Sequence, residues 1–366
     1  VALGRRQGAV EGLVGLVGMF GKFYSGKTVL VTGHTGFKGA WLSLWLRDLG
    51  ADVHGFALVP HSSPNLHEVL VSGTFVGETF GEVGNFEMVK ETIASAKPDI
   101  VFHLAAQPLV RRSYEAPLET ATANILGTAH VLEAVRQNEI DCPMVVVTSD
   151  KCYENDGSSR AFTENDPLGG HDIYSASKAA AEIMTRSWRL SFKGRIATAR
   201  AGNVIGGGDY GVDRIIPDCV RALEAGKPIT VRNPAATRPW QHVLEPLSGY
   251  LSLACKLSKD DELNGEPFNF GPPGDHSYSV QELVRSMAGN LPGIKWKEST
   301  DSKSDHHESG LLKLNCDKAL QYLGWHSVLS FHETVRITTD WYRDYYNEPT
   351  TIRDTTFAQI AEYVST

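Results

Sequence analysis

The sequence predicts a doubly wound α/β fold, in which a Rossmann-type parallel sheet is joined to a smaller, mixed α/β substrate-binding lobe. Two observations support this prediction. Short apolar runs alternate with segments of helical period from residue 27 to about residue 205, and a glycine pattern directly follows the first apolar run. Strands that alternate with helices imply right-handed crossovers, and therefore a parallel sheet whose two faces are both covered.

The individual elements follow from apolar periodicity and from the position of glycine and proline. Residues 27–58 read as a strand, a glycine-rich turn, an amphipathic helix and a second strand, which together make a βαβ unit. The elements expected after it are a strand at 74–80, a helix at 85–97, a strand at 99–105, a long helix ending near 138, a strand at 143–150, a helix at 174–193 and a strand at 195–206.

The regular alternation then ends, and glycines and prolines become frequent. We therefore expect a first domain at residues 26–202, which contains the glycine pattern and to which residues 235–270 return. Residues 203–234 and 271–366 are expected to form the second lobe. Residues 1–25 are expected to precede the fold as an extension, either disordered or the product of an overlong start assignment.

Composition restricts the class of protein. Of the 366 residues, 42% are apolar and 21% are charged, which is typical of a globular chain and excludes a disordered one. The formal net charge of −8 gives no electrostatic reason to bind nucleic acid, and no apolar run is long enough to span a membrane. The 5 cysteines, an odd number without zinc-type spacing, predict a reducing cytoplasm and no metal site.

The turn after the first strand predicts a dinucleotide site. Gly33, Gly36 and Gly39 form GxxGxxG between a strand and a helix, so the backbone can approach a pyrophosphate and direct helix N-terminal amides toward its charge. The second strand ends without the acidic residue that usually binds the adenosine ribose, but no basic residue stands there for a 2′-phosphate, so NAD is expected rather than NADP. Glu82 either accepts a hydrogen bond from adenine or is a solvated loop carboxylate. The expected cofactor contacts are Gly33, His34, Thr35, Gly36, Phe37, Lys38, Gly39, Glu82, Val83, Leu104, Ala105, Ala106, Tyr174 and Lys178.

A catalytic group is predicted near two strand and helix termini. Tyr174 and Lys178 lie four residues apart on one helix face, where an ammonium would lower the tyrosine pKa and prepare the phenol to take a hydroxyl proton. The strand PMVVVTSD ends at the sheet edge where ligands bind, so Ser149 could hydrogen-bond the reacting hydroxyl. Asp150 and Lys151 offer an acid and a base there. The alternatives are an exposed helical pair and a solvated turn with a surface ion pair.

These motifs together carry a family resemblance. GHTGFKG, HLAAQ, TSDKCY, YSASK, GNVIGGGD and RPWQHVLEP resemble the extended short-chain dehydrogenases, and specifically the sugar-nucleotide 4,6-dehydratases that act on CDP-glucose. The resemblance covers residues 20–341, and Asp150-Lys151 in place of the usual Asp-Glu is similar to this branch, as are His34 and the missing ribose acid. It implies loosely held NAD, a cytoplasmic homodimer or homotetramer, and a role in making the 3,6-dideoxyhexoses of bacterial lipopolysaccharide O-antigen.

The resemblance also implies a reaction, the conversion of CDP-D-glucose to CDP-4-keto-6-deoxy-D-glucose and water. Tyr174, helped by Lys178 and Ser149, would take the C4 hydroxyl proton as hydride passes from C4 to NAD. Lys151, or a base of that pair, would remove the C5 proton, while Asp150 protonates the leaving C6 hydroxyl. The hydride then returns to C6, so that NAD is regenerated in each turnover.

Substrate contacts are expected mainly from the second lobe. Arg238 in RPWQHVLEP resembles the arginine that binds the diphosphate in this superfamily, and a guanidinium suits bidentate contacts to oxyanions. Asn124 is expected to support the active site from the long helix, whereas His103 is expected to be a structural residue at a strand end. The remaining candidate substrate contacts are Asn203, Arg214 and His307.

Three other functions stay open. A nucleotide-sugar 4-epimerase shares the glycine turn and YxxxK, but it needs no C5 base or C6 acid, and Asp150 and Lys151 therefore argue against it. A 4,6-dehydratase of another nucleotide sugar is the stronger alternative, because base recognition is expected in the more variable second lobe. A non-enzymatic, NAD-responsive binding protein would be expected to have lost Tyr174, Lys178 or Ser149, which are all present.

Overall fold

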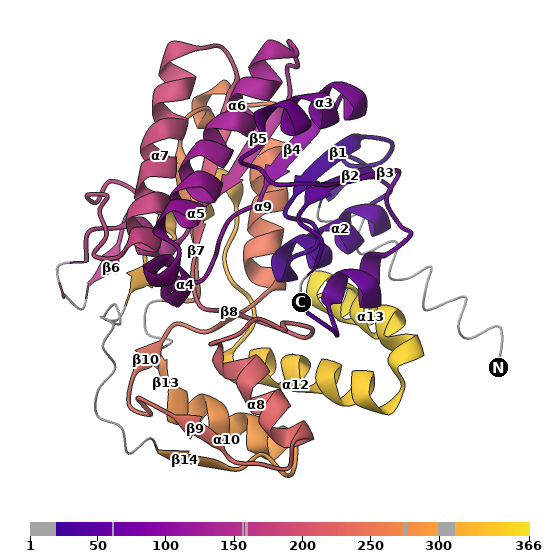
Figure 1. Cartoon of the computed structure of the whole chain (residues 1–366), viewed down its shortest axis with the longest axis vertical. Coiled ribbons are helices and arrows are strands. Elements are labelled where there is room, and N and C mark those ends of the chain that lie inside the picture. Colours follow the sequence, from indigo (N-terminus) through magenta and orange to yellow (C-terminus); the bar gives the residue numbers. More distant parts are fainter. Residues whose placement is uncertain (1–19, 61, 156, 158–159, 274–276, 299–311) are drawn as a thin grey trace.

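The fold is built on one parallel sheet of seven strands (Figure 1). The computed structural model describes residues 20–60, 62–155, 157, 160–273, 277–298 and 312–366. The strand order is β12-β7-β5-β4-β1-β2-β3, so the chain winds outward from β1 in both directions. The predicted doubly wound α/β fold is therefore confirmed. The strands are β1 (Thr28–Thr32), β2 (Asp52–Ala57), β3 (Gly77–Phe80), β4 (Ile100–His103), β5 (Pro143–Val147), β7 (Arg195–Ala201) and β12 (Pro267–Phe270).

Helices cover both faces of this sheet (Figure 1). One face is covered by α3 (Phe86–Ala96), α6 (Gly127–Gln137) and α7 (Ile173–Ser191), and the other by α2 (Phe37–Asp48) and α9 (Leu244–Leu257).

Alternation along each strand builds the two cores. In β1, Val29 and Val31 pack in the core that contains α2 and α9, whereas Leu30 packs in the core that contains α3 and α6. In β5, Val145 and Met144 divide in the same way. Because successive side chains of a strand point to opposite faces, a strand buried on both sides reads as a continuous apolar run. The sheet is therefore fixed by a packed core on each of its two faces.

The region between β4 and β5 differs from the predicted single long helix. It consists of α4 (Val110–Glu115), α5 (Pro117–Ala121), the π-helix η2 (Thr122–Leu126) and α6. Ala116 has a non-helical backbone (φ −133°, ψ 67°), and Pro117 occupies the first turn of α5. Proline suits that first turn but cannot continue a helix, since it has no amide hydrogen to donate.

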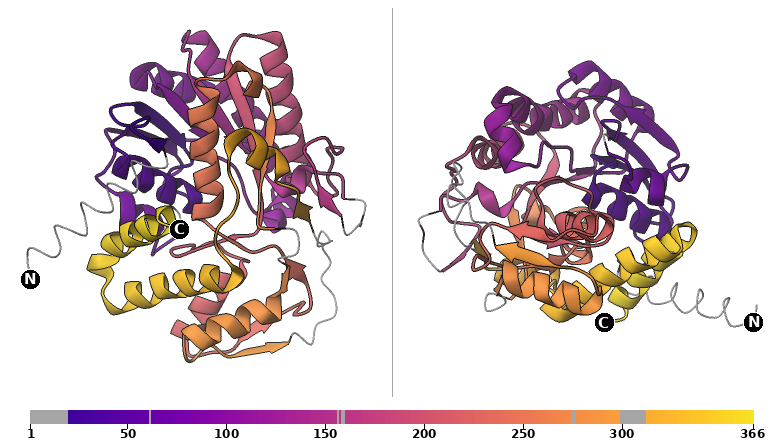
Figure 2. Two further views of the ribbon diagram at one scale, coloured as in Figure 1. Left: turned by 180° about the vertical axis from the view of Figure 1, so that it is seen from behind. Right: turned by 60° about the horizontal axis from the view of Figure 1, so that its bottom comes forward.

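The smaller lobe lies beyond the carboxyl edge of the sheet and consists of short helices and strands (Figures 1 and 2). Its sheets have only two strands each, β14 with β9 and β10 with β13. Its elements are α8 (Ile215–Glu224), β9 (Ile229–Val231), β10 (Thr237–Arg238), β13 (Tyr278–Ser279), α10 (Val280–Asn290) and β14 (Trp296–Glu298). Capping boxes at Ser279 and Ser330 begin α10 and the long helix α12 (Phe331–Asn347).

The remaining elements of the described chain lie outside the main sheet and its covering helices. They are the π-helix η1 (His67–Val71), the 3-10 helices η3 (Asp150–Cys152), η4 (Asp261–Leu263) and η5 (Pro349–Thr351), the paired strands β6 (Ala161–Phe162) with β15 (Lys313–Leu314) and β8 (Val204–Ile205) with β11 (Gln241–His242), and the helices α11 (Asp317–Leu323) and α13 (Ile352–Val364).

The expected boundaries of the domains need two corrections. Residues 271–366 do not all belong to the smaller lobe, because α13 packs beside the helices of the large sheet, where the Tyr363 hydroxyl donates to Glu245 of α9 over 2.8 Å. The predicted N-terminal extension is also too long. Tyr24 is buried and its hydroxyl donates to the Leu251 carbonyl over 2.6 Å, so the folded part already includes residues 20–25.

Two general features bear on the cellular setting. Within the described ranges, no helix is both long and apolar enough to cross a bilayer. All five cysteines are free thiols, and Cys142, Cys152 and Cys219 are buried.

Candidate active site

A cleft of about 1600 Å³ lies at the carboxyl ends of the strands, between the sheet and the smaller lobe. In open α/β sheets, ligands bind at this edge, near the point where the winding of the chain reverses. That point lies between β1 and β4 here. Pockets for single drug-sized ligands measure about 300–1,000 Å³, so this cleft is larger than one such ligand needs.

The glycine turn at one end of the cleft is shaped for a phosphate group. Gly33 has φ +76°, and a Cβ there would lie 2.7 Å from the Ala105 backbone nitrogen. A Cβ at Gly39 would lie 2.1 Å from the Gly33 carbonyl oxygen, so both positions need glycine. No side chain caps the N-terminus of α2, where Gly36 is the N-cap residue. The amides of its first turn are therefore available to an anion, and the turn fits the pyrophosphate of a dinucleotide.

Most of the predicted cofactor contacts line this cleft. They are Gly33, Thr35, Gly36, Phe37, Lys38, Gly39, Glu82, Val83, Leu104, Ala105, Ala106, Tyr174 and Lys178. His34 is different, because its side chain is fully buried and turns to Glu78, with Nε2 and Oε1 2.7 Å apart. Burial lowers the pKa of His34, against the opposing effect of Glu78. The His34 side chain therefore does not line the cleft, and His34 stays a predicted cofactor contact only through its position in the glycine turn.

The end of β2 carries apolar side chains where a ribose-binding acid is common. Leu58 and Val59 line the cleft and are 47% and 57% exposed. Apolar side chains of this size exposed in a cleft indicate contact with a ligand. Glu82 also lines this part of the cleft.

Lys38 reaches from the glycine turn toward the middle of the cleft. Its Nζ donates to the Tyr250 hydroxyl over 3.4 Å and lies 5.9 Å from the centre of that ring. Burial and the charges of Lys178 and Arg214 lower the pKa of Lys38 to about 8. Lys38 thus belongs to the same group of interacting charges as the predicted catalytic lysine.

The end of β5 places Ser149 and Asp150 in the cleft. Both are buried, and the Ser149 hydroxyl donates to Asp150 Oδ1 over 2.9 Å. A Cβ at Gly202 would lie 1.9 Å from Asp150 Oδ2, so only glycine leaves room for this carboxylate. Asn203 Nδ2 lies 3.5 Å from the same oxygen. Lys151 follows in η3, lines the cleft and is half-buried.

Helix α7 brings Tyr174 and Lys178 to the same part of the cleft. Asp172 begins this helix by accepting a hydrogen bond from the Ser175 amide over 2.9 Å. Burial raises the pKa of Tyr174 to about 12, although a hydrogen bond with Ser149 acts in the opposite direction. The expected lowering of the tyrosine pKa is therefore wrong for this structure, because removal of the phenolate from water outweighs its partners.

Lys178 lines the cleft but is buried there. Its Nζ donates to the Val147 carbonyl over 3.3 Å, which ties α7 to the last residue of β5. Burial lowers the pKa of Lys178 to about 8, and Glu182 opposes this shift. The ammonium therefore becomes titratable near neutral pH.

A buried polar network below these residues was not predicted. Glu182 lies one helical turn after Lys178 and pairs with Arg200 of β7, with Nη2 and Oε2 2.8 Å apart. Both side chains are only 3% exposed. Glu182 also accepts hydrogen bonds from Thr148 and Thr198. The network joins α7, β5 and β7, and the acidic residue four positions after Lys178 was the available sequence signal.

Two other predicted supports can be placed. Asn124 Nδ2 donates to Ser177 of α7 over 2.8 Å, while its Oδ1 accepts from the Gln107 amide over 2.8 Å. His103 lies between the hydroxyls of Thr32 and Thr128, at 2.7 and 3.1 Å. Burial lowers the pKa of His103 to about 3, which agrees with a neutral structural residue.

Three of the expected substrate residues also line the cleft. Arg214 Nη1 lies 3.0 Å from both carboxylate oxygens of Asp209. Arg238 Nη1 donates to the Thr237 carbonyl over 2.8 Å, and Arg214, Arg238 and Asn203 all line the cleft. His307 lies outside the described residues. Arg111 and Arg232 also line the cleft and pair with Asp213, a contribution that the sequence did not reveal.

Comparison with known proteins agrees with this geometry. The profile of the family described as GDP-mannose 4,6 dehydratase matches residues 30–338. The chain belongs to this family. A CDP-glucose 4,6-dehydratase of Salmonella typhimurium is 44% identical over 330 residues, which are 88% of this chain and 92% of that protein. A dTDP-glucose 4,6-dehydratase of Xanthomonas campestris is 25% identical and covers 86% of this chain and 93% of its own length.

Solved structures share the fold over nearly the whole chain. An epimerase of Methanothermobacter thermautotrophicus has a TM-score of 0.77 and 24% identity, covering 93% of this chain and 97% of its own. A dTDP-glucose 4,6-dehydratase of Bacillus anthracis in complex with NAD has a TM-score of 0.72 and 21% identity, covering 88% and 99%. At these identities, the likeness concerns the fold.

Proposed function

We propose that this chain is an NAD-dependent lyase that converts CDP-D-glucose to CDP-4-keto-6-deoxy-D-glucose and water. One observation carries the proposal. A tyrosine, a serine, an aspartate and a lysine for acid–base chemistry meet at the carboxyl edge of the sheet, in the cleft that also contains the glycine turn. The 44% identity to a CDP-glucose 4,6-dehydratase supports this choice of reaction and substrate.

The cleft fits NAD. The glycine turn and the free amides of α2 suit its pyrophosphate, and Leu58 and Val59 offer apolar surface for the adenosine. When bound, NAD supplies a hydride acceptor for C4 and a hydride donor for C6, and its cationic ring favours the phenolate of Tyr174. The sequence has no Arg or Lys at residues 58–62, directly after β2, to bind a 2′-phosphate, which supports NAD over NADP.

In the first step, Tyr174 accepts the proton of the C4 hydroxyl while C4 loses hydride. Ser149 supports this transfer, because it hydrogen-bonds Tyr174 and lowers its pKa against the effect of burial. Lys178 holds its ammonium at the end of β5, behind the reacting tyrosine. The sugar is left as a 4-ketone, whose C5 proton is acidic.

In the second step, Lys151 and Asp150 carry out an elimination. Lys151 in its neutral form accepts the C5 proton, and the electron pair of that bond forms the C5–C6 double bond. Protonated Asp150 gives its proton to the C6 hydroxyl, which leaves as water. The structure places Asp150 within 2.9 Å of Ser149, so the acid stands beside the site of the first step.

In the last step, C6 gains hydride and C5 gains a proton, which the protonated Lys151 returns. The product is a 4-keto-6-deoxy sugar. Tyr174 still holds the C4 hydroxyl proton and Asp150 lacks the proton that left in water, so transfer of one proton from Tyr174 to Asp150 restores both groups, and Ser149, hydrogen-bonded to each, lies between them. Arg238 is proposed to bind the diphosphate of the substrate, and Arg214 and Asn203, which line the same cleft, are proposed as further substrate contacts. His307 stays a proposed contact from the sequence alone.

The position of Asp150 and Lys151 separates this function from its nearest alternative. A 4-epimerase needs hydride transfer and the Tyr174 base, but no C5 base and no C6 acid. Both additional groups line the cleft here. A dehydratase acting on another nucleotide sugar would use the same groups, so the nucleotide base has to be tested directly.

The test is mass spectrometry of the sugar nucleotide after incubation with NAD and, separately, CDP-glucose, UDP-glucose and dTDP-glucose. The proposal expects loss of one water from CDP-glucose alone. A mass-neutral conversion to the galactose isomer would assign the epimerase activity instead, and dehydration of only UDP- or dTDP-glucose would correct the nucleotide. Unchanged substrates despite NAD binding would refute the dehydratase proposal.

A variant of the elimination step gives a matched control. In Lys151→Met, oxidation at C4 is expected to continue while water loss stops, so NADH absorbance appears and no dehydrated product forms. Lys193→Met, which changes an exposed lysine at the end of α7, is expected to behave as the unchanged protein.

The proposal includes the setting of the enzyme. We place it in the cytoplasm as a homodimer or homotetramer, making precursors of 3,6-dideoxyhexoses for lipopolysaccharide O-antigen. Five free thiols support a reducing compartment. The exposed Leu118 and Leu126, 82% and 51% accessible near the outer helices, support a contact between copies of the chain.

A further inference from the structure

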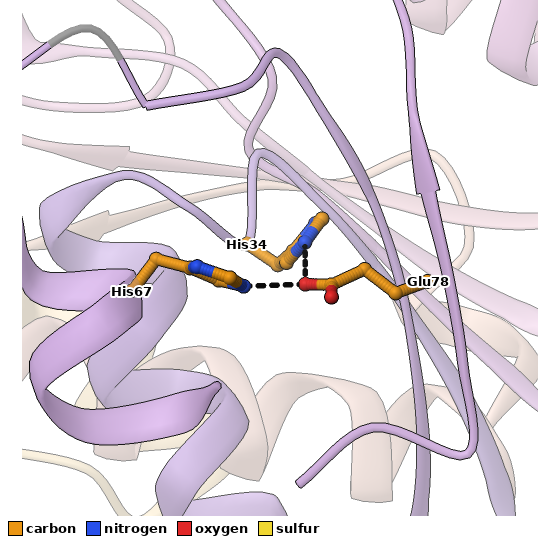
Figure 3. A group of neighbouring side chains, drawn as sticks. All are labelled: His34, His67 and Glu78. Carbon is orange, nitrogen blue, oxygen red and sulfur yellow. Dashed lines mark hydrogen bonds and ion pairs between the residues drawn. The ribbon is translucent and has the colours of Figure 1, made fainter. Parts of the chain in front are cut away.

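Three side chains of metal-binding type meet on the far side of the glycine turn (Figure 3). His34 Nε2 lies 2.7 Å and His67 Nε2 2.5 Å from the same carboxylate oxygen of Glu78. The ligand atoms of all three lie within 4.8 Å of one another. In the part of the chain that the structure describes, this is the one group of three or more such residues.

The three residues come from separate elements that the fold holds in place. His34 belongs to the turn after β1, His67 begins η1, and Glu78 lies in β3. Gly55 of β2 pairs with Glu78, and a Cβ there would lie 2.7 Å from the His34 ring. Only glycine at this strand position leaves room for the imidazole. The site is therefore shaped by the backbone as well as by the three side chains.

The surroundings of the group are apolar on one side and open on the other. Phe75 lies edge-on to His34 at 4.8 Å and is stacked on His67 at 6.1 Å, and Phe80 lies 5.9 Å from His67. His34 and His67 are buried, whereas the Glu78 side chain is 23% exposed. An ion could therefore reach the group from the Glu78 side and be shielded from water on the other.

The ligand set matches one class of metal. Two imidazole nitrogens and one carboxylate oxygen are the three protein ligands of many zinc sites, in which water takes the fourth position. Zinc–ligand distances are about 2.0–2.2 Å, so the three atoms would have to separate slightly from their present hydrogen-bond distances. A single carboxylate oxygen now serves both imidazoles, and His34 Nδ1 is buried without a hydrogen-bond partner.

We propose that His34, His67 and Glu78 form a binding site for a divalent first-row transition metal, with Zn²⁺ as the first candidate. The site lies outside the catalytic cleft and takes no part in the proposed reaction. Because His34 lies between Gly33 and Thr35, a bound ion would fix the glycine turn to η1 and β3. The spacing of these ligands, 44 residues from His34 to Glu78, matches no metal motif, which explains why the sequence predicted no metal.

The test uses the full chain after removal of metal ions by a chelator. Addition of Co²⁺ is expected to produce the visible absorption bands of a four- or five-coordinate site with one equivalent bound, and Zn²⁺ is expected to displace it. His67→Asn and Glu78→Gln should each weaken binding roughly 100-fold or more, since even changes outside the ligand set cost about 10–100-fold.

A matched control is His54→Asn. His54 is a neighbouring histidine of β2 whose ring lies next to Gly77 and outside the group, so this variant should bind Co²⁺ like the unchanged protein. Zn²⁺ should also raise the melting temperature of the unchanged protein and of His54→Asn, but not of Glu78→Gln. This second measurement applies even where His67→Asn does not fold.

Several results would overturn the proposal. It fails where the unchanged protein binds no Co²⁺ at millimolar concentration, or where Glu78→Gln binds and responds as well as the unchanged protein. Equal loss in His54→Asn would assign the bound ion to another histidine. In any of these cases, the group is a carboxylate that joins two imidazoles by hydrogen bonds.

Discussion

The two walls of the cleft are built in different ways. On the sheet side, Ser149, Asp150, Tyr174 and Lys178 are at most 7% exposed. The Glu182 network beneath them joins two strands and a helix. On the side of the smaller lobe, arginines extend from loops and from strands of two or three residues. The proposed chemistry thus rests on two packed cores, whereas the proposed substrate contacts rest on short pieces that neighbouring loops can change.

The largest expected effect concerns Tyr174, the proposed catalytic base on the buried side of the cleft. Tyr174→Phe should lower kcat by roughly 10²–10⁴-fold, because it removes the group that accepts the C4 proton. Steady-state product formation measures this, with NAD binding measured in parallel to show that the cofactor site is intact. Tyr322→Phe, at an exposed tyrosine of α11, is the control. Activity retained within a few fold in Tyr174→Phe would contradict the proposed role.

The next effect tests the network beneath that wall. Glu182→Ala should lower the free energy of unfolding by about 3–5 kcal/mol, because it leaves the Arg200 guanidinium buried without its partner. Glu133→Ala removes a partner of Arg136 at the surface and should cost at most about 1 kcal/mol. Denaturant midpoints compare the two variants. If the two variants lost similar free energy of unfolding, the buried Glu182 network would contribute no more to stability than a surface ion pair.

Substitution of Arg238, on the side of the smaller lobe, should change the KM for the substrate more than kcat. Arg238→Met is expected to raise the KM for CDP-glucose by about 10–100-fold, since a hydrogen bond to a charged group contributes roughly 1.5–3 kcal/mol. The expected melting temperature is close to that of the unchanged protein. Initial rates over a range of substrate concentrations give the comparison. A fall in kcat at unchanged KM would move Arg238 from substrate binding to the chemical step.

The smallest effect concerns pH. Burial lowers the pKa of Lys178 to about 8, so its ammonium is present below that pH and is lost as the pH rises through it. Above pH 8, kcat/KM should fall about tenfold per pH unit. Lys178→Arg keeps its charge in this range, so the alkaline limb of its residual activity should move upward. An unmoved limb would assign the titration to another group, such as Lys38 with its pKa of about 8.

Local pattern was enough for most of the fold. The strands and the glycine turn were predicted because a two-sided sheet needs continuous apolar runs and because a close backbone approach needs glycine. The prediction of one long helix before β5 was wrong, because the apolar periodicity of the sequence continues across the break at Ala116 and Pro117. Periodicity reports which side chains face the core and does not report where the helical axis is interrupted.

That most of the candidate residues line one cleft could be predicted from the sequence, but their pKa shifts could not. Tyr174 and Lys178 were found from their spacing, yet the direction of the Tyr174 pKa shift depends on burial, which no local pattern contains. His34 was assigned to the cofactor because it lies in the turn. Its actual partner Glu78 is 44 residues away and becomes visible only when β2 and β3 pair.

The position of β12 has a consequence for recombination among relatives. The last strand of the sheet, Pro267–Phe270, pairs with Thr198–Ala201 of β7 only after the chain has passed through part of the smaller lobe. A crossover that exchanged everything after β7 would give the new chain a foreign edge strand, and a truncation there would expose the edge of β7 to self-association. A graft intended to change substrate preference should therefore replace only segments between β7 and β12, with β12 kept from the same parent as β7.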